Sequence, residues 1–247
     1  AYIAAVLREA KHTVILLDPE NQDMTYDDVA SLIQKERPDI VGITSATANF
    51  GNAIKLARIA KQAGDPLVVF GGIHATSLPD EVLTKYQEID IVVVGEGEIT
   101  MRELCDAMDS GRRVDYASIA GLAFRNDSGQ IEKSPPRPLN MDLDSLPLPA
   151  RDLLPLEKYG VQINMITMKG IKATMISSRG CPSYCTFCAA HIVTGRVYRP
   201  RSTESVVDEM EYLVRKYNTK FIQFYDDTFT INYKRTVDVC NSIIKRG

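Results

Sequence analysis

Three of the chain's five cysteines lie close together in the stretch "SSRGCPSYCTFCAAH", residues 177–191. Cys181, Cys185 and Cys188 have the spacing C-x3-C-x2-C, which is too tight for a disulfide framework. Three thiolates on one loop direct soft sulfur ligands at one small volume, and such ligands favour an iron–sulfur cluster or zinc. The spacing therefore predicts a metal centre on this loop.

Spacing alone leaves the kind of metal open. Structural zinc needs a fourth ligand, which His191 could supply three residues after Cys188. Unliganded thiols are a third alternative. The odd number of cysteines, without a disulfide framework, indicates a reducing, cytoplasmic compartment. Cys105 and Cys240 fall on helical patterns, where each is expected to be a small buried apolar residue.

The cysteine loop lies between a predicted strand and a predicted helix. "ATMISS" (173–178) leads into the loop, and an apolar stripe in 206–217 predicts the helix that follows. "KFIQFYDDTFT" (220–230) is the next strand, followed by a last helical pattern. A ligand loop at the carboxyl end of a strand is typical of active sites in β/α barrels. Two strand–helix units cannot close a barrel, so residues 171–247 are predicted to form only the start of one.

The first 110 residues alternate short β-branched runs with amphipathic helical patterns. Strands are predicted at 13–18, 39–45, 66–72 and 89–97. These runs are continuously apolar, which is typical of a parallel sheet covered by helices on both faces. Residues 1–115 are therefore predicted to form a doubly wound, Rossmann-like α/β domain.

Residues 116–170 have a different composition. "GLAFRNDSGQIEKS" (121–134) predicts a hairpin that turns at Asp127, Ser128 and Gly129. "SPPRPLNMDLDSLPLPARDLLP" (134–155) contains six prolines, too many for a helix or a central strand. This range is expected to be an ordered linker between two domains.

Charge and hydropathy argue against two classes of partner. The net charge of −3 provides no overall attraction to nucleic acid or to an anionic membrane. No apolar run approaches the roughly 20 residues that span a bilayer. The chain begins without an initiator Met and ends within a helical pattern, so we expect a fragment truncated at both ends.

With Phe187 just before the last cysteine, the loop reads C-x3-C-x-aromatic-C after a strand, which resembles the signature of radical S-adenosylmethionine (SAM) enzymes. The resemblance implies that Cys181, Cys185 and Cys188 hold three irons of a [4Fe-4S] cluster. It also implies that SAM chelates the fourth iron and is cleaved to a 5′-deoxyadenosyl radical, and that Phe187 belongs to the cofactor site.

Charged residues around the loop have two interpretations each. By resemblance to the same family, Asp226 or Asp227 contacts the methionyl ammonium of SAM, and the alternative is that one of them caps a following turn. Four arginines either tune the charge of the cluster, pair with an anionic substrate or form a solvated basic face. These are Arg179, Arg196, Arg199 and Arg201.

The N-terminal sheet resembles the cobalamin-binding domain found ahead of many radical SAM barrels. The resemblance is carried by "GITSATAN" (42–49), "VFGGIHATSLPDE" (69–81) and "VVVGEGE" (92–98). It implies corrinoid contacts in three turns at consecutive strand ends, although each alone could be an ordinary β-to-α connection. The expected contacts are Thr44, Ser45, Gly71, Gly72, Gly95, Glu96 and Gly97. His74 is expected to be a turn or cap residue, and whether a protein histidine binds the cobalt stays open.

Together the resemblances imply a cobalamin-dependent radical SAM enzyme that transfers a methyl group to an unactivated carbon of a small molecule. They also imply an external electron donor of the flavodoxin or ferredoxin type. An oxidative cyclase is an alternative on the same scaffold, and a non-catalytic cobalamin- or zinc-binding module is an alternative of another class. A methylthiotransferase acting on transfer RNA would carry further cluster cysteines in its N-terminal domain, whereas residues 1–104 contain none.

Overall fold

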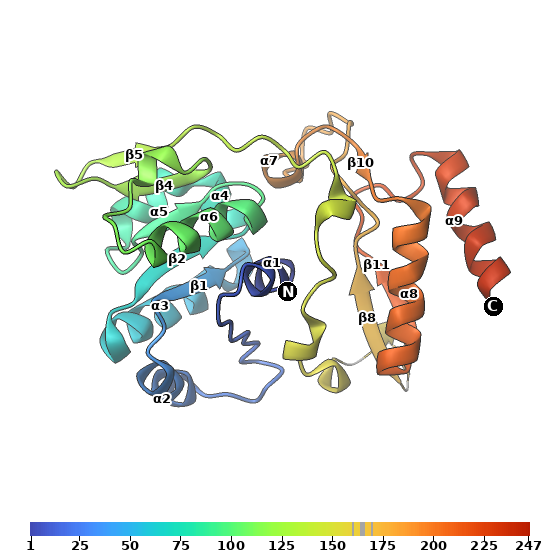
Figure 1. Cartoon of the computed structure of the whole chain (residues 1–247), viewed down its shortest axis with the longest axis horizontal. Coiled ribbons are helices and arrows are strands. Elements are labelled where there is room, and N and C mark those ends of the chain that lie inside the picture. The colour runs from blue at the N-terminus through green and yellow to red at the C-terminus, as the bar shows by residue number, and fades with distance from the viewer. Residues whose placement is uncertain (160, 164–165, 169) are drawn as a thin grey trace. The chain divides into compact units, whose positions relative to one another are not determined.

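The fold is that of a computed structural model, which describes residues 1–159, 161–163, 166–168 and 170–247. Residues 160, 164, 165 and 169, which fall in the expected linker, lie outside the described residues. The chain divides into two compact units (Figure 1). The N-terminal unit comprises residues 6–14 and 23–139, and the C-terminal unit comprises residues 1–5, 15–22 and 140–247. No helix in the described part of the chain is long and apolar enough to cross a membrane.

The N-terminal unit is a five-stranded sheet with helices. Its elements, including a first helix that contributes residues to both units, are α1 (Tyr2–Glu9), α2 (Tyr26–Glu36), β1 (Ile40–Thr44), η1 (Thr47–Asn49), α3 (Phe50–Gly64), β2 (Leu67–Gly71), α4 (Ile73–Ser77), α5 (Pro79–Lys85), β3 (Ile91–Val93), α6 (Glu98–Asp109), η2 (Tyr116–Ser118), β4 (Leu122–Arg125) and β5 (Ile131–Lys133). The strand order is β1-β2-β3-β4-β5. The first three strands pair in parallel, and β4 and β5 continue the sheet in antiparallel fashion.

Both faces of this sheet are buried. Val68 and Phe70 of β2 point to a core that includes α2, α3 and α5. Val69, between them, points to the opposite core, which includes Leu104 of α6. Because side chains alternate along a strand, a run apolar at every position must be covered on both sides. The predicted doubly wound arrangement is confirmed.

Two expectations for this region were wrong in detail. Residues 13–18 are not a strand, because a β-branched run forms one only where a partner strand faces it. This segment instead leaves the sheet, since Val14 belongs to the N-terminal unit and Ile15 to the C-terminal unit. The hairpin at 121–134 forms as predicted, with the Gly129 amide donating to the Asn126 carbonyl oxygen at 2.8 Å. However, β4 pairs with β3, so the hairpin is part of the sheet and not of a linker.

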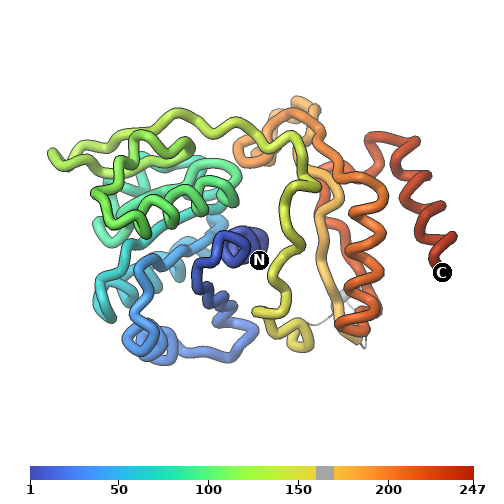
Figure 2. The backbone as a smooth tube through the Cα atoms, in the orientation of Figure 1, coloured from blue at the N-terminus to red at the C-terminus, as the bar shows by residue number. Residues whose placement is uncertain are grey.

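The C-terminal unit contains the strand–helix pattern predicted after residue 171. Its elements are η3 (Leu143–Ser145), η4 (Arg151–Leu153), η5 (Leu156–Lys158), β6 (Val161–Ile163), β7 (Ile166–Met168), β8 (Ile171–Met175), β9 (Ser178–Arg179), α7 (His191–Thr194), β10 (Arg199–Pro200), α8 (Thr203–Tyr217), β11 (Thr219–Phe224) and α9 (Tyr233–Arg246). From β8 the chain runs through the cysteine loop and α8, then returns in β11 parallel to β8 (Figure 2).

Helix α8 has clear start and stop signals. The Ser202 side chain accepts a hydrogen bond from the Ser205 amide at 3.1 Å, and Asn218 ends the helix in a left-handed conformation. Val206 and Val207 are buried against Met175 of β8, and Val239 of α9 joins the same cluster. This small core holds β8 and β11 side by side, so the loops after both strands emerge at the same edge.

Candidate functional site

The carboxyl ends of β1 and β2 lie in register. Thr44 pairs with Gly71 across the parallel strands, so the turns that follow begin side by side. The Ser45 amide donates to the Gly71 carbonyl oxygen at 3.2 Å, which joins the two turns. Four predicted corrinoid contacts, Thr44, Ser45, Gly71 and Gly72, are therefore neighbours at one edge of the sheet, where ligands bind in such folds.

Gly72 permits the close contact between the first two turns, and Ser45 has a feature that fits a ligand. Gly72 has a φ of +90°, and an added Cβ would lie 2.6 Å from the Ser45 carbonyl oxygen, so only glycine fits there without a shift of the backbone. Ser45 is 4% exposed, and its hydroxyl has no hydrogen-bond partner among the described residues. An unpaired buried hydroxyl is unfavourable unless a further group pairs with it. The residues present thus fit a polar ligand group at this edge.

Helix α4 connects the turns, a feature that sequence reasoning missed. The Nδ1 atom of His74 lies 3.1 Å from Thr47 Oγ1, and its ring packs on Phe50 with 3.9 Å between ring centroids. Two residues later, Thr76 Oγ1 accepts a hydrogen bond from the Gly95 amide at 3.2 Å. The polar residues spaced by two in "GGIHAT" were the available signal. We call the three connected turns, residues 44–50, 71–76 and 94–97, the rim.

The third turn of the rim contains the remaining predicted corrinoid contacts. Gly95 has a φ of +86° and is tied to the second turn through Thr76. Glu96 is half-buried. Gly97 precedes α6, and its carbonyl oxygen accepts the Met101 amide at 2.9 Å. The structure thus brings Gly95 to the other two turns, while Gly97 serves as the N-cap of α6.

The three cysteines lie on an irregular loop between β9 and α7. Cys181 is half-buried, Cys185 and Cys188 are exposed, and all three are free thiols. Phe187 is also exposed. Within the described residues, no three His, Cys, Asp or Glu side chains lie close enough together to hold a metal ion, and this includes any set with His191. The donor set of three free thiols on one loop fits a thiophilic metal centre.

Arg196, which follows the cysteine loop and α7 in the chain, contacts the first half of the loop. Its guanidinium donates to the Ser183 carbonyl oxygen and lies 4.4 Å from the centre of the Tyr184 ring. Ser183 and Tyr184 stand between Cys181 and Cys185, so this cation fixes the backbone between two predicted ligands.

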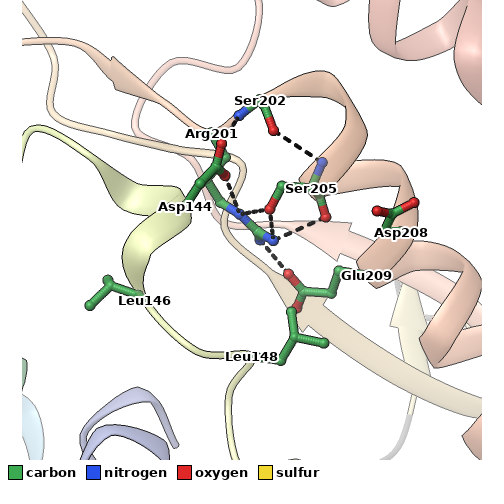
Figure 3. Close-up of a pocket in the computed structure, with 8 residues that line it drawn as sticks. All are labelled: Asp144, Leu146, Leu148, Arg201, Ser202, Ser205, Asp208 and Glu209. Carbon is green, nitrogen blue, oxygen red and sulfur yellow. Dashed lines mark hydrogen bonds and ion pairs between the residues drawn. The ribbon is translucent and has the colours of Figure 1, made fainter.

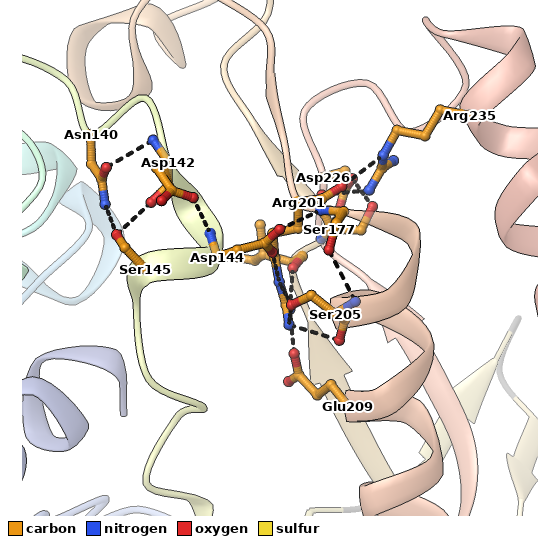
Figure 4. Close-up of polar contacts among 12 residues, drawn as sticks. Asn140, Asp142, Asp144, Ser145, Ser177, Arg201, Ser205, Glu209, Asp226 and Arg235 are labelled. Atoms are coloured by element: carbon orange, nitrogen blue, oxygen red, sulfur yellow. Dashed lines mark hydrogen bonds and ion pairs between the residues drawn. The ribbon is translucent and has the colours of Figure 1, made fainter.

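Asp226 and Asp227 follow β11 and accept hydrogen bonds from the stretch that leads into the cysteine loop. Asp226 is bonded to Ser177 (Figure 4), and Asp227 is bonded to Gly180. The nearest helix, α9, is capped instead by Asn232, whose side chain accepts from the Arg235 amide at 3.1 Å. Neither aspartate therefore caps that helix.

Three of the four arginines that bracket the loop are buried, so they do not form a solvated basic face. Arg179, Arg199 and Arg201 are 8%, 1% and 6% exposed. Arg199 donates to the carbonyl oxygens of Asn140 and Thr194, both at 2.8 Å. These cations organise the backbone around the loop.

Arg201 belongs to a buried ion network on α8. Its guanidinium pairs with Glu209 (Figure 3). Glu209 is fully buried and also lies 2.6 Å from Arg151. A shallow pocket of about 390 Å³ opens beside this network, lined by Asp144, Leu146, Leu148, Arg201, Ser202, Ser205, Asp208 and Glu209. Of the predicted residues, Arg201 alone lines it, and the Arg201 guanidinium is already paired with Glu209, so the pocket is not a candidate cofactor site.

The two cysteines outside the loop differ from each other. Cys105 is half-buried against the core of the N-terminal sheet, and burial raises the pKa of its thiol to about 11. Cys240 is exposed, so the expectation of burial was wrong for it. Helix α9 buries its neighbour Val239, and adjacent residues on a helix point in directions about 100° apart.

Comparison with known proteins identifies both units. The B12 binding domain family matches residues 1–105, and the Radical SAM superfamily matches residues 175–246. An uncharacterized methyltransferase of Pyrococcus horikoshii, PH0819, is 39% identical over 251 aligned positions, which cover 100% of this chain and 52% of that protein. The anaerobic magnesium-protoporphyrin IX monomethyl ester cyclase of Rubrivivax gelatinosus is 36% identical over 249 positions, covering 100% of this chain and 44% of that protein. The chain spans about half the length of these curated relatives.

The same architecture occurs in a solved structure. TsrM from Kitasatospora setae, a radical SAM methyltransferase solved with cobalamin and a [4Fe-4S] cluster bound, superposes with a TM-score of 0.77 at 22% identity. The superposition covers 99% of this chain and 47% of TsrM. The predicted fold class, a cobalamin-binding sheet followed by the start of a radical SAM barrel, is confirmed. The chain belongs to the radical SAM proteins that carry a B12 binding domain.

Proposed function

We propose that this chain is the cofactor-binding part of a cobalamin-dependent radical SAM enzyme that transfers a methyl group to an unactivated carbon. The observation that carries the proposal is the presence, on one chain, of two strand-end sites of different chemistry. One is a rim with an unpaired buried hydroxyl at Ser45, and the other is a loop with three free thiols. The 39% identity to a protein named as a methyltransferase supports methyl transfer as the reaction.

In the C-terminal unit, Cys181, Cys185 and Cys188 would hold a [4Fe-4S] cluster through three thiolates. When bound, the cluster and SAM supply a 5′-deoxyadenosyl radical, and cobalamin supplies a methyl carrier. The protein's part is to hold and orient these groups and to exclude water around them. Phe187 would cover the cofactor side of the loop, and Asp226 or Asp227 would contact the SAM ammonium.

In the N-terminal unit, Ser45 and Thr44 would contact the nucleotide tail of the corrinoid. The Ser45 hydroxyl is the best supported of these contacts because it is buried and lacks a protein partner. Gly71 and Gly72 would let the ligand approach the backbone, since neither presents a side chain. The third turn would add Gly95, Glu96 and Gly97.

Several finer points belong to the same proposal. The substrate is a small molecule, and the electron donor is a flavodoxin or ferredoxin in a reducing cytoplasm. The functional boundaries are residues 1–115 for cobalamin, 116–170 for the connection and 171–247 for the barrel start, with the hairpin of the connection extending the cobalamin sheet. The low-potential chemistry of a [4Fe-4S] centre supports a flavodoxin or ferredoxin as the electron donor.

Anaerobic reconstitution with iron and sulfide tests the metal assignment. We expect a brown protein with broad visible absorption and about four irons per chain. Cys185→Ala should lose most of this iron, whereas Cys240→Ala, an exposed cysteine on α9, should keep it. One tightly bound zinc that excludes iron would contradict the assignment. The full-length protein with SAM and dithionite should then release 5′-deoxyadenosine, and the chain alone should show no turnover.

An oxidative cyclase is the second candidate, favoured by the 36% identity to a protein with that name. SAM labelled with deuterium in its methyl group distinguishes the two reactions. A methyltransferase passes the label to the bound corrinoid and onward to the product. If the full-length protein makes 5′-deoxyadenosine but leaves the corrinoid unlabelled, the methyl-transfer proposal fails and the cyclase is favoured.

A further inference from the structure

The cysteine loop is closed at its base. Strands β9 and β10 pair in antiparallel fashion, with Arg179 opposite Arg199. Just inside this pair, Gly180 has a φ of +83°, and an added Cβ would lie 2.2 Å from the Val197 carbonyl oxygen and 3.0 Å from that of Thr194. The backbone that enters the loop therefore presses directly on the backbone that leaves it, and only glycine permits this contact.

A single carboxylate oxygen bridges the two ends of the loop. Asp227 Oδ2 accepts a hydrogen bond from the Gly180 amide at 2.9 Å. The same oxygen lies 3.0 Å from Thr194 Oγ1, the last residue of α7. Gly180 immediately precedes Cys181, and Thr194 follows Cys188 by six residues. The single hydroxyl hydrogen of Thr194 can also reach the Ala190 carbonyl oxygen at 3.1 Å. Because a carboxylate oxygen is a stronger acceptor than a neutral carbonyl oxygen, we expect this hydrogen to go to Asp227, which then restrains both ends.

Asp226 is used differently. Its Oδ1 accepts from the Ser177 amide at 2.7 Å, and its Oδ2 accepts from the hydroxyls of Ser177 and Ser178 at 2.6 and 2.5 Å (Figure 4). Both serines are buried at the end of the strand that leads to the loop. Asp226 thus joins the end of β11 to the β8–β9 connection, before the loop begins. Asp227 is the one of the pair that contacts both ends of the loop.

We propose that Asp227 is a positioning residue that holds the two ends of the cysteine loop together, so that a cluster meets its three thiolates at little conformational cost. The inference rests on the proposed function for the identity of the metal, whereas the restraint itself rests on the contacts of Asp227. Closing the base shortens the free part of the loop, and shorter loops lose less entropy when their ends are fixed. The loop then samples fewer conformations, so less conformational entropy is lost when the three thiols bind a cluster.

Hydrogen exchange of the metal-free chain tests the restraint directly. In Asp227→Ala, a peptide covering residues 176–182 should exchange roughly 10- to 100-fold faster, the range that corresponds to loss of a hydrogen bond to a charged group. Asp227→Asn keeps an oxygen acceptor without the charge and should lie between Ala and the wild type. Asp238→Ala, which removes an exposed carboxylate on α9, should leave this peptide unchanged.

The consequence for the metal is measured on the reconstituted chain. We expect Asp227→Ala to bind iron more slowly than the wild type and to show an altered electron paramagnetic resonance spectrum after reduction, while Asp227→Asn restores most of both. A purely structural loss would lower the melting temperature of Asp227→Ala without such rescue.

The outcomes separate this inference from the proposed function. If exchange at 176–182 is unchanged in both Asp227 variants, the inference is overturned even when the wild type binds a cluster. If exchange rises as expected but the wild type takes up no iron, the restraint by Asp227 is supported and the proposed cluster is contradicted. Unchanged spectra and iron uptake in Asp227→Ala, despite faster exchange, would show that the restraint by Asp227 has no part in cluster assembly. That result would overturn the positioning role of Asp227.

Discussion

The rim and the cysteine loop both lie at the carboxyl ends of parallel strands, but they are fixed to different extents. In the rim, the His74–Thr47 contact and the hydrogen bond that Thr76 accepts from the Gly95 amide connect three turns. In the cysteine loop, Gly180 and Asp227 hold the base and Arg196 contacts the Ser183 carbonyl oxygen, while Cys185 and Cys188 are exposed. The two sites therefore differ in what the protein prepares in advance.

The difference follows from the ligands each site is proposed to take. A corrinoid arrives as a finished, rigid molecule, so a preformed surface reduces the ordering cost of binding. A metal cluster is completed by its thiolates, and metal binding itself supplies free energy to order a loop. We therefore expect the cluster, when it binds, to order the tip of the loop on a base that the protein already fixes.

The largest effect is expected from the buried ion network of Arg151, Arg201 and Glu209 on α8. Glu209→Ala would leave the guanidiniums of Arg151 and Arg201 buried without their carboxylate, which costs about 3–5 kcal/mol. Urea unfolding should show the loss, and Glu204→Ala, in the exposed first turn of the same helix, should cost less than about 1 kcal/mol. Equal losses in the two variants would mean that the network does not support the loop.

Gly72→Ala should disrupt the rim and spare the cysteine loop, and Gly180→Ala should disrupt the cysteine loop and spare the rim. Gly72→Ala and Gly180→Ala each combine a positive φ with an overlap against backbone, for a loss of about 3 kcal/mol. Gly129→Ala, with a positive φ in open space, should lose only about 1–2 kcal/mol. Gly72→Ala should reduce corrinoid uptake and leave iron uptake intact, and Gly180→Ala should do the reverse. If either variant loses both, the two sites do not form independently.

A smaller effect is expected from Ser45→Ala, and its sign is informative. Removing a buried hydroxyl that lacks a protein partner should leave the stability of the ligand-free chain unchanged or raise it by up to about 1 kcal/mol. The affinity for aquacobalamin, measured by titration, should fall about tenfold if this hydroxyl meets the ligand. Ser128→Ala, at the exposed hairpin turn, should change neither quantity. A clear loss of stability in Ser45→Ala would show that the hydroxyl has a structural partner.

Alkylation of the thiols should report the openness of the loop without changing stability. At pH 8 in the metal-free chain, iodoacetamide should modify the exposed Cys185, Cys188 and Cys240 quickly. Cys105 should react slowly, because burial raises its pKa to about 11 and leaves about one thiol in a thousand ionised at pH 8. Its reaction should accelerate as the pH approaches 11. After cluster assembly, mass spectrometry should find Cys240 modified and Cys185 and Cys188 protected; protection of Cys185 before assembly would contradict an open tip.

Much of the fold could be predicted from periodicity. The strands at 39–45, 66–72 and 89–97 correspond to β1, β2 and β3, because apolar runs of this length need burial on both faces. The run at 13–18 failed because a strand requires a partner that local sequence does not name. The prediction that the hairpin belongs to a linker was wrong for the same reason, since pairing of β4 with β3 is a contact between segments far apart in the sequence.

The sequence alone determined which residue types stand at each strand end: the three spaced cysteines, the Gly71–Gly72 pair and the two consecutive aspartates. Only the tertiary structure decided what these residues touch. It placed Asp227 against Gly180 and Thr194, left the Ser45 hydroxyl without a partner among the residues that the structure describes, and buried arginines that the sequence allowed to be solvated. The physical reason is that spacing along the chain fixes direction within one element, whereas burial and hydrogen bonding depend on which distant segments pack there.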